Sequence, residues 1–343
     1  MSFWQDNDFR IDPWGEGYGT PVSFENDEEE DLDVEVDISV EGRGWASITP
    51  ISESRNPDRL VFIDGRRRID CLLVGRNEND VLYGAFGTIG VGAVEVFPNS
   101  TNAANYNAIE IQRVLSFSGD FKGEPSQNAL IPCPVGSSSS IEYTLHKSLL
   151  KREADPQASK AQIQALMRRS ETRLAQSLAN ELSDIDELII LDGNLFSRLE
   201  KVLGYVKTLR KQYLTGEKSS LLWNLKPGER TPIFTIGKED RDLLWSWYIR
   251  SGTNDINYQR LGFHGLHGII RLEMNVSGTP LEEAKRIADI STTLIPRFAS
   301  HPARDPRAPQ NLIPVGALEK ELGRRMGDSK LIQRYINNFL QSG

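Results

Sequence analysis

Residues 61–74, VFIDGRRRIDCLLV, decide how the chain folds. A short apolar run ends in Asp64 and Gly65, and apolar residues resume after three arginines. This pattern predicts a buried strand, a sharp turn at Gly65 and a second strand, because short apolar runs form core strands and an Asp-Gly pair favours a turn. Asp64 would then lie at the rim of a sheet.

The same pattern recurs at residues 188–195, LIILDGNL, where four apolar residues lead into Asp192 and a glycine. Two acids are therefore expected at the ends of two core strands, which suggests a metal site. For either acid taken singly, an ordinary Asp-Gly turn is the preferred interpretation. A third acid in an unusual position favours the metal site.

That third acid belongs to a long helix predicted over residues 156–182. On a helical wheel, Glu171 falls within the apolar stripe that contains Met167 and Leu174. An acid in an apolar stripe is costly unless something pairs with it. A frayed or tilted helix would let Glu171 reach water. The favoured interpretation is that Glu171 points at a cation, since the strand that carries Asp192 follows directly.

Length and composition restrict the class of protein. A chain of 343 residues can form one large domain or two ordinary ones. Its apolar runs are far shorter than the roughly 20 residues that span a bilayer, and no basic-then-apolar leader opens the sequence. Cys71 and Cys133 can build neither a disulfide framework nor a four-thiolate zinc site. A cytoplasmic protein without a membrane segment is expected.

The net charge of -8 is concentrated in one stretch, because nine acids lie within residues 25–37. The rest of the chain is close to neutral and locally basic, so a polyanionic substrate is compatible with the acidic total. From residue 31 acids alternate with apolar residues, which predicts an edge strand in an acidic N-terminal extension, residues 1–55. A partner-binding edge and a DNA-mimicking gate are two hypotheses for this extension. Residues 56–343 would form the main domain.

Local patterns predict the remaining elements of an α/β fold. Strands are expected at residues 81–96, 109–117, 229–237 and 268–276. Helices are expected at residues 196–213, 280–293 and from 314 to the end. Residues 243–250 fit either a strand or a short helix, and residues 118–142 fit a loop.

Three acids supplied by two strands and a helix suit a hard divalent cation. Carboxylates bind Mg²⁺ or Mn²⁺ through oxygen and leave positions for phosphate. Such a cluster supports phosphodiester hydrolysis, in which metals activate water and stabilise the leaving oxygen. Other chemistries have weaker support, since the four histidines form no HExxH or HxH motif and no serine or cysteine nucleophile motif is present.

Basic residues follow both strand-end acids. Arg67 lies three residues after Asp64, and Lys207 and Arg210 follow Asp192. Such residues usually belong to a solvated surface. Because they adjoin the acids, contacts with phosphate are about equally expected here.

Several segments occur in a specific order: FIDGRRRID, a helix with RRSE, LIILDGNL, GYVKTLRKQY, ERTPIFTIG, WSWYIR, IIRLEM and RAPQNLIPVGALEKELGRRMGD. In this order they resemble the NurA nuclease family, from about residue 60 to the C-terminus. The resemblance implies an RNase H-like fold, a mixed sheet flanked by helices, whose carboxylates hold one or two Mn²⁺ or Mg²⁺ ions. Residue by residue, the implied ligands are Asp64, Glu171 and Asp192, with Glu181 as a weaker option for the second.

The resemblance also implies an activity and partners. NurA proteins are metal-dependent DNA nucleases that act as single-strand endonucleases and 5′–3′ exonucleases. They form homodimers around a channel for DNA and work with the hexameric HerA ATPase in DNA repair by end resection or, in some bacteria, in phage defence. Arg67, Lys207, Arg210 and Arg230 would hold DNA phosphates. A catalytically inactive RNase H-like scaffold that docks DNA to the motor is the alternative function.

The chain departs from the family pattern in two places. The common Asp-Gly-Ser has Arg66 instead of serine, which removes a hydroxyl and adds a charge beside the expected metal. Near the C-terminus many members carry an Ala-His pair, whereas residues 317–319 are Ala-Leu-Glu here. His301 is the candidate to replace that histidine from a neighbouring loop.

Overall fold

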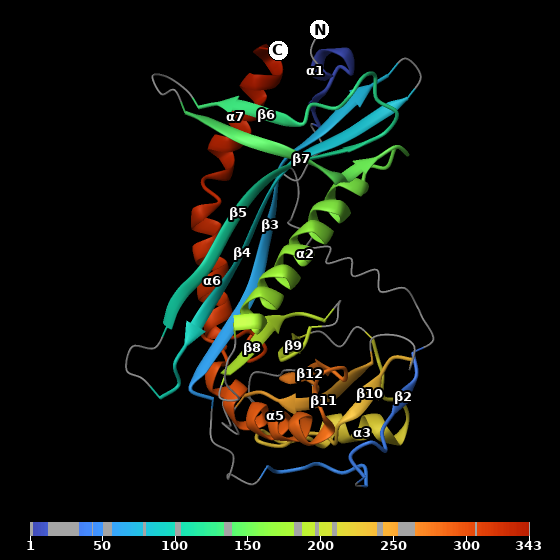
Figure 1. Ribbon diagram of the computed structural model, residues 1–343, viewed down its shortest axis with the longest axis vertical. Coiled ribbons are helices and arrows are strands. Elements are labelled where there is room, and N and C mark those ends of the chain that lie inside the picture. The colour runs from blue at the N-terminus through green and yellow to red at the C-terminus, as the bar shows by residue number, and fades with distance from the viewer. Residues whose placement is uncertain are drawn as a thin grey trace.

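The computed structural model describes residues 3–12, 34–42, 44–50, 57–77, 80–99, 104–133, 139–181, 187–195, 199–207, 211–238, 243–252, 265–305 and 307–342. In this part of the chain the strands form a 12-stranded mixed sheet with helices packed against it (Figure 1). The molecule is elongated, and long strands rise from a lower block to the end where both termini lie. This architecture is consistent with the α/β fold that the sequence predicts.

The helices are α1 (Phe3–Asp6), α2 (Ala158–Glu181), α3 (Glu217–Asn224), α5 (Leu281–Leu294), the 3-10 helix η1 (Ile295–Phe298), α6 (Ile313–Arg325) and α7 (Ser329–Ser342). The strands are β1 (Arg10–Ile11), β2 (Val36–Asp37), β3 (Arg59–Arg76), β4 (Val81–Val96), β5 (Ala104–Ser118), β6 (Asn128–Pro132), β7 (Ser140–Lys151), β8 (Glu187–Asp192), β9 (Val202–Val206), β10 (Phe234–Ile236), β11 (Leu244–Arg250) and β12 (Ile269–Asn275).

Strand β3 runs without interruption through residues 61–74, so the predicted turn at Gly65 is wrong. Gly65 pairs with Val91 in the antiparallel ladder between β3 and β4. The apolar residues on both sides of Gly65 share this one long partner strand, and a turn at Gly65 would cost the ladder its hydrogen bonds. Asp64 is therefore an interior residue of a strand.

The two edges of β3 have different neighbours. On one edge, β4 and β5 follow as antiparallel strands, and β7 and β6 extend that side. On the other edge, β8 runs parallel to β3 and β9 runs parallel to β8, and the sheet continues through β12, β11, β10 and β2. The pairing of β3 with β8 stops at Ile63, so β3 continues upward after β8 has ended.

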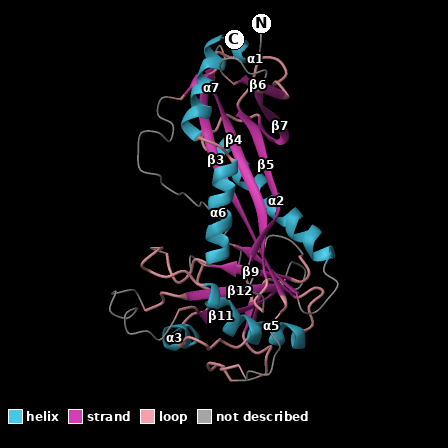
Figure 2. Ribbon diagram, turned by 90° about the vertical axis from the view of Figure 1, so that its left-hand side faces the viewer, coloured by secondary structure: helices cyan, strands magenta, loops and turns pink. Residues whose placement is uncertain are grey.

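Helices α2 and α6 cover opposite faces of the long strands (Figure 2). Leu178 of α2 packs in one core cluster with Ile63, whereas Leu318 of α6 packs in another with Phe62. Neighbouring residues of a strand point to opposite faces, which places the two helices on the two sides of β3. Gly87 of β4 allows the close approach of α2, because a Cβ there would lie 2.6 Å from a methyl carbon of that helix.

The segment after Asp192 contains a strand, and the helix predicted over residues 196–213 is wrong. Its described residues, 199–207 and 211–213, include β9 and no helix. The run VLGYV is short, apolar and buried at all five positions. This pattern suits a central parallel strand, which is covered on both faces.

The first residues of the chain join the core at the upper end. Phe3 and Trp4 belong to a cluster of buried residues from the long strands and α7. The Trp4 ring stacks on Phe86 of β4, with 5.5 Å between centroids, and meets Phe339 of α7 edge-on. The N-terminal extension is therefore packed into the main body at its beginning.

The acidic stretch meets the sheet at β2, which lies at the end of the strand order beside β10. Val34, Val36 and Ile38 are partly buried against the lower core. Residues 13–33, with most of the acids, lie outside the described part of the chain. The structure therefore shows an edge strand here and leaves both hypotheses for the extension as predictions.

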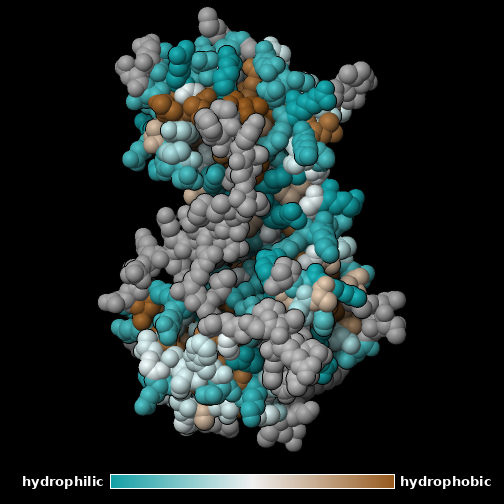
Figure 3. Space-filling view, turned by 180° about the vertical axis from the view of Figure 1, so that it is seen from behind, coloured by the Kyte–Doolittle hydropathy of each residue, from teal (hydrophilic) through white to brown (hydrophobic). Residues whose placement is uncertain are grey.

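Apolar surface gathers at the upper end of the face shown in Figure 3. At this end of the molecule Leu130 of β6 is 56% exposed and Leu150 of β7 is 38% exposed. The upper end thus combines an aromatic core with exposed apolar side chains. Among the described helices, none is long and apolar enough to cross a membrane.

Trp4→Ala is expected to lower the free energy of unfolding by about 3 to 5 kcal/mol, because it removes a buried ring between β4 and α7. Asp6→Ala changes an exposed residue of the same helix and should have an effect below about 0.5 kcal/mol. Urea unfolding followed by circular dichroism measures both. Equal, small effects would show that α1 contributes nothing to the core.

Candidate metal centre

The two predicted strand-end acids meet where β3 and β8 part. The last paired residues of these parallel strands are Ile63 and Leu191, so Asp64 and Asp192 are the next residue of each strand. Adjacent strands lie about 4.8 Å apart, which brings these two residues side by side. Beyond this point β3 has lost β8 as its neighbour, and the edge of the sheet is open to side chains from either face.

Glu171 reaches the same place from α2. Its Oε1 would lie 2.4 Å from a Cβ added at Gly65, so the absence of a side chain at Gly65 creates the space for the carboxyl group. The backbone N–H of Gly65 donates a hydrogen bond to Glu171. Glu171 is therefore held against the strand directly after Asp64, while the weaker option, Glu181, is exposed at the last residue of α2.

Burial dominates the electrostatics of these acids. Asp64 is 7% exposed, and burial together with the charges of Asp192 and Glu171 raises its pKa well above the usual range. Glu171 is also 7% exposed, and burial and the charge of Asp192 raise its pKa to about 8. Asp64 Oδ2 has no hydrogen-bond partner among the described residues. Burial thus favours the protonated form of both groups when no cation is bound.

Asp192 differs from the other two acids because it has a cation. The Lys207 ammonium lies 2.5 Å from Asp192 Oδ2, just after the end of β9. Burial alone would lower the pKa of Lys207, but the charges of Asp192 and Asp64 outweigh it and raise that pKa. Strand β9 runs beside β8 and so brings this lysine next to Asp192, in a segment where the sequence predicts a helix.

A fourth acid, Glu319 of α6, also belongs to this neighbourhood. Its charge acts on both Asp64 and Lys207 and raises the pKa of each. In the sequence, Glu319 belongs to the Ala-Leu-Glu at residues 317–319 that departs from the Ala-His pair of the NurA resemblance. That departure points to an acid near the centre, at 34% side-chain exposure.

The donor set fits a hard divalent cation. Carboxylate oxygens from Asp64, Glu171 and Asp192 are the ligand type that Mg²⁺ and Mn²⁺ prefer. Two features would suit a bound cation: the Asp64 oxygen, which has no hydrogen-bond partner in the described part of the chain, and the Glu171 carboxyl group held at Gly65. In the described part of the chain no three acids, histidines or cysteines already surround one point. The acids approach from both faces of the sheet, and a cation would draw them together.

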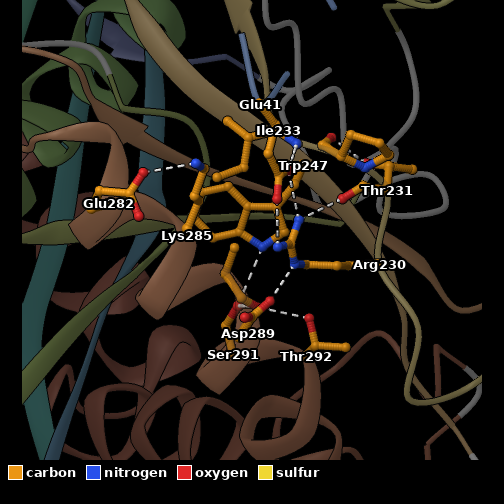
Figure 4. A network of polar contacts seen from close by, with 12 residues as sticks. Glu41, Arg230, Thr231, Ile233, Trp247, Glu282, Lys285, Asp289, Ser291 and Thr292 are labelled. Atoms are coloured by element: carbon orange, nitrogen blue, oxygen red, sulfur yellow. Dashed lines mark hydrogen bonds and ion pairs between the residues drawn. The ribbon is translucent and has the colours of Figure 1, made fainter. Parts of the chain in front are cut away.

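The expected phosphate contact of Arg230 is contradicted by its surroundings (Figure 4). Its side chain is 2% exposed and donates to both carboxylate oxygens of Glu41, at 2.9 and 3.0 Å, and to Asp289 of α5 at 2.6 Å. An arginine so enclosed cannot reach DNA. Arg230 instead links the N-terminal segment to α5 through a buried ion pair. Its partners lie far away in the sequence and come close only in the folded chain, so the sequence could not predict the pair.

The other predicted residues have varied positions. Arg67 is half-buried in β3, and strand alternation places it on the α2 face with Gly65. Arg210 lies outside the described residues. His301 is exposed in the loop after η1, where its Nδ1 accepts a hydrogen bond from the Ala303 N–H. The structure thus gives His301 a part in a local turn.

Glu171→Gln is expected to stabilise the metal-free protein at pH 8. The folded-state pKa of about 8 exceeds the ordinary 4.5, so the folded protein holds a proton that the unfolded chain has lost between these values. The free energy of unfolding should therefore fall as pH rises through this window, by up to about 1.4 kcal/mol per pH unit. The glutamine variant loses this slope, which urea unfolding in EDTA at pH 5.5 to 8.5 measures.

Glu181→Gln, on the exposed end of the same helix, is the matched control and should keep the wild-type slope. A wild-type slope in Glu171→Gln would mean that Glu171 is ionised in the folded protein.

A comparison with known families finds a match over most of the chain. A family model described as a NurA domain matches residues 58–315, which include Asp64, Glu171, Asp192 and Lys207. Glu319 lies just beyond the matched range. A search of curated proteins finds no match. Since the family model covers most of the sequence, the resemblance is confirmed: this chain belongs to the NurA family, which is a nuclease-type family.

Proposed function

We propose that the protein is a Mn²⁺- or Mg²⁺-dependent deoxyribonuclease with its centre at Asp64, Glu171 and Asp192. The observation that carries the proposal is the buried Asp64 carboxyl group with an unpaired Oδ2. A buried polar atom without a partner costs folding free energy and calls for a functional explanation. A divalent cation bound by the three carboxylates provides that explanation.

The fold supports an RNase H-like assignment. Three antiparallel strands, β3 to β5, precede helix α2, and the parallel strands β8 and β9 follow on the other edge of β3. Asp64 lies on the central strand β3 and Asp192 on its neighbour β8. Glu171 lies on α2, the helix that precedes β8 in the sequence. Strands β6, β7 and β10 to β12 are then additions at the two ends of this unit.

The chain's own residues supply positions and charges for phosphodiester hydrolysis. Asp64, Glu171 and Asp192 would hold the cation, which when bound activates water and stabilises the leaving oxygen. Gly65 orients Glu171 through its backbone N–H. Arg67, on the α2 face of the strand that carries Asp64, is a candidate for binding phosphate, and Lys207 offers its ammonium beside Asp192.

The DNA substrate and the partners are proposed from the family. Single-stranded DNA, cut internally or from the 5′ end, is the substrate that we infer. A homodimer would act with a HerA-type hexameric ATPase in the cytoplasm, in end resection or in phage defence. Arg210 remains a candidate for DNA binding, and Arg230 is withdrawn because it is buried.

Cleavage of labelled single-stranded DNA with Mn²⁺, by the protein with and without its ATPase, tests the function. Asp64→Ala and Asp192→Ala should lower the rate on the order of 100-fold or more, because each removes a carboxylate of the centre. Glu181→Ala removes an exposed acid of α2 and should cut like wild type. Wild-type rates in the first two variants would contradict the site, and no cleavage by the wild-type complex would establish the inactive scaffold.

Gly65→Ala tests the space that holds Glu171. The added Cβ would lie 2.4 Å from Glu171 Oε1 and must displace the carboxyl group, so Mn²⁺ should bind about 10- to 100-fold more weakly. Gly316→Ala in α6 is the control, because a Cβ there meets nothing within 4 Å. Isothermal titration calorimetry measures both variants. Wild-type affinity in Gly65→Ala would show that Glu171 is not a ligand.

A further inference from the structure

The acid cluster contains a cation of its own. Lys207 Nζ lies 2.5 Å from Asp192 Oδ2, and the two side chains are 18% and 12% exposed. The pair is therefore largely removed from solvent, unlike the exposed ion pairs of helices. A lysine side chain confined in this way acts as a fixed charge beside the reacting groups.

The backbone and the ammonium of Lys207 both have further contacts. The Gln310 side chain donates a hydrogen bond to the Lys207 carbonyl at 3.3 Å. The Tyr205 hydroxyl donates to the Gln310 carbonyl at 2.7 Å, which ties this loop to β9. The ammonium also lies 6.0 Å from the centre of the Tyr205 ring. These contacts hold the Lys207 backbone beside the loop at Gln310, and the ammonium pairs with Asp192.

The acids fall into two groups as a result. Asp192 has its counter-charge in Lys207. Asp64 has an unpaired oxygen, and Glu171 is held in the space above Gly65. A divalent cation would therefore be held by Asp64 and Glu171, with Asp192 on the neighbouring strand. Another divalent cation on Asp192 Oδ2 would have to displace a buried ammonium.

We propose that the Lys207 ammonium takes the place of a second metal ion, so that the centre binds one divalent cation per chain. This rests on the proposed nuclease function. In two-metal sites the ions lie about 3.5 to 4 Å apart and stabilise the attacking and leaving oxygens. Here the carboxylates would hold one metal ion, which would stabilise one of these oxygens, and the ammonium, a compact charge with three donors, would stabilise the other.

Counting bound Mn²⁺ tests the proposal. Calorimetric titration and electron paramagnetic resonance of the full-length wild-type protein should give one ion per chain, without coupling between neighbouring Mn²⁺ spins. Lys207→Met keeps the apolar stem and removes the charge, and it should bind two ions with spin coupling. Lys207→Gln is the second variant in case the first does not fold. Lys211→Met is the matched control, because Lys211 lies over Tyr213 and its variant should keep one ion.

Each outcome separates the inference from the function on which it rests. Two ions per wild-type chain would overturn the role of Lys207 and leave the nuclease centre intact. One Mn²⁺ ion per chain in the wild type and in both Lys207 variants would also overturn the role of Lys207, since the carboxylates alone would then set the number of bound ions. No bound Mn²⁺ in the wild type would overturn the proposed function itself.

Discussion

The parting of β3 and β8 after Ile63 and Leu191 is the constraint on which the rest of the molecule depends. Because β8 ends there, the Gly65 N–H bonds to Glu171. The open edge also lets side chains from the two faces of the sheet approach one another, as a continuous sheet would not. The long strands beyond the parting point carry the upper core, and α2 and α6 seal the two faces on either side.

The same geometry makes the centre costly to fold. Asp64 and Glu171 are buried, and burial raises the pKa of both, although the charge of Lys207 acts against this at Asp64 and the charge of Arg168 acts against it at Glu171. Ordinary packing compensates: apolar residues of α2 pack against Ile63 and its neighbours directly beside the acids. A protein that only needed stability would place apolar side chains at these two positions. Under the proposed function, the two acids lower the stability of the fold and in return supply ligands for a cation.

The sequence predicted the acids better than the path of the backbone. An apolar run before an Asp-Gly pair identified Asp64 and Asp192, and helical periodicity exposed Glu171 as out of place. The same Asp-Gly pair wrongly predicted a turn at Gly65. Glycine is favoured in turns, but it also occurs in a strand where a neighbouring side chain, here the Glu171 carboxyl group, needs the space of a Cβ. Arg230 could not be interpreted from sequence, since its partner Glu41 lies 189 residues away.

Two departures from the family pattern prove to be in contact. Arg66, which replaces the common serine, donates to the backbone carbonyl of Glu319 at 3.1 Å. Gly323, one turn further along α6, leaves space for the guanidinium, since a Cβ there would lie 2.9 Å from it. The Arg66 side chain thus holds α6, the helix that carries Glu319, against β3. The Glu319 carboxyl group in turn adds negative charge around Asp64 and Lys207, so the contact between Arg66 and α6 bears on the electrostatics of the centre.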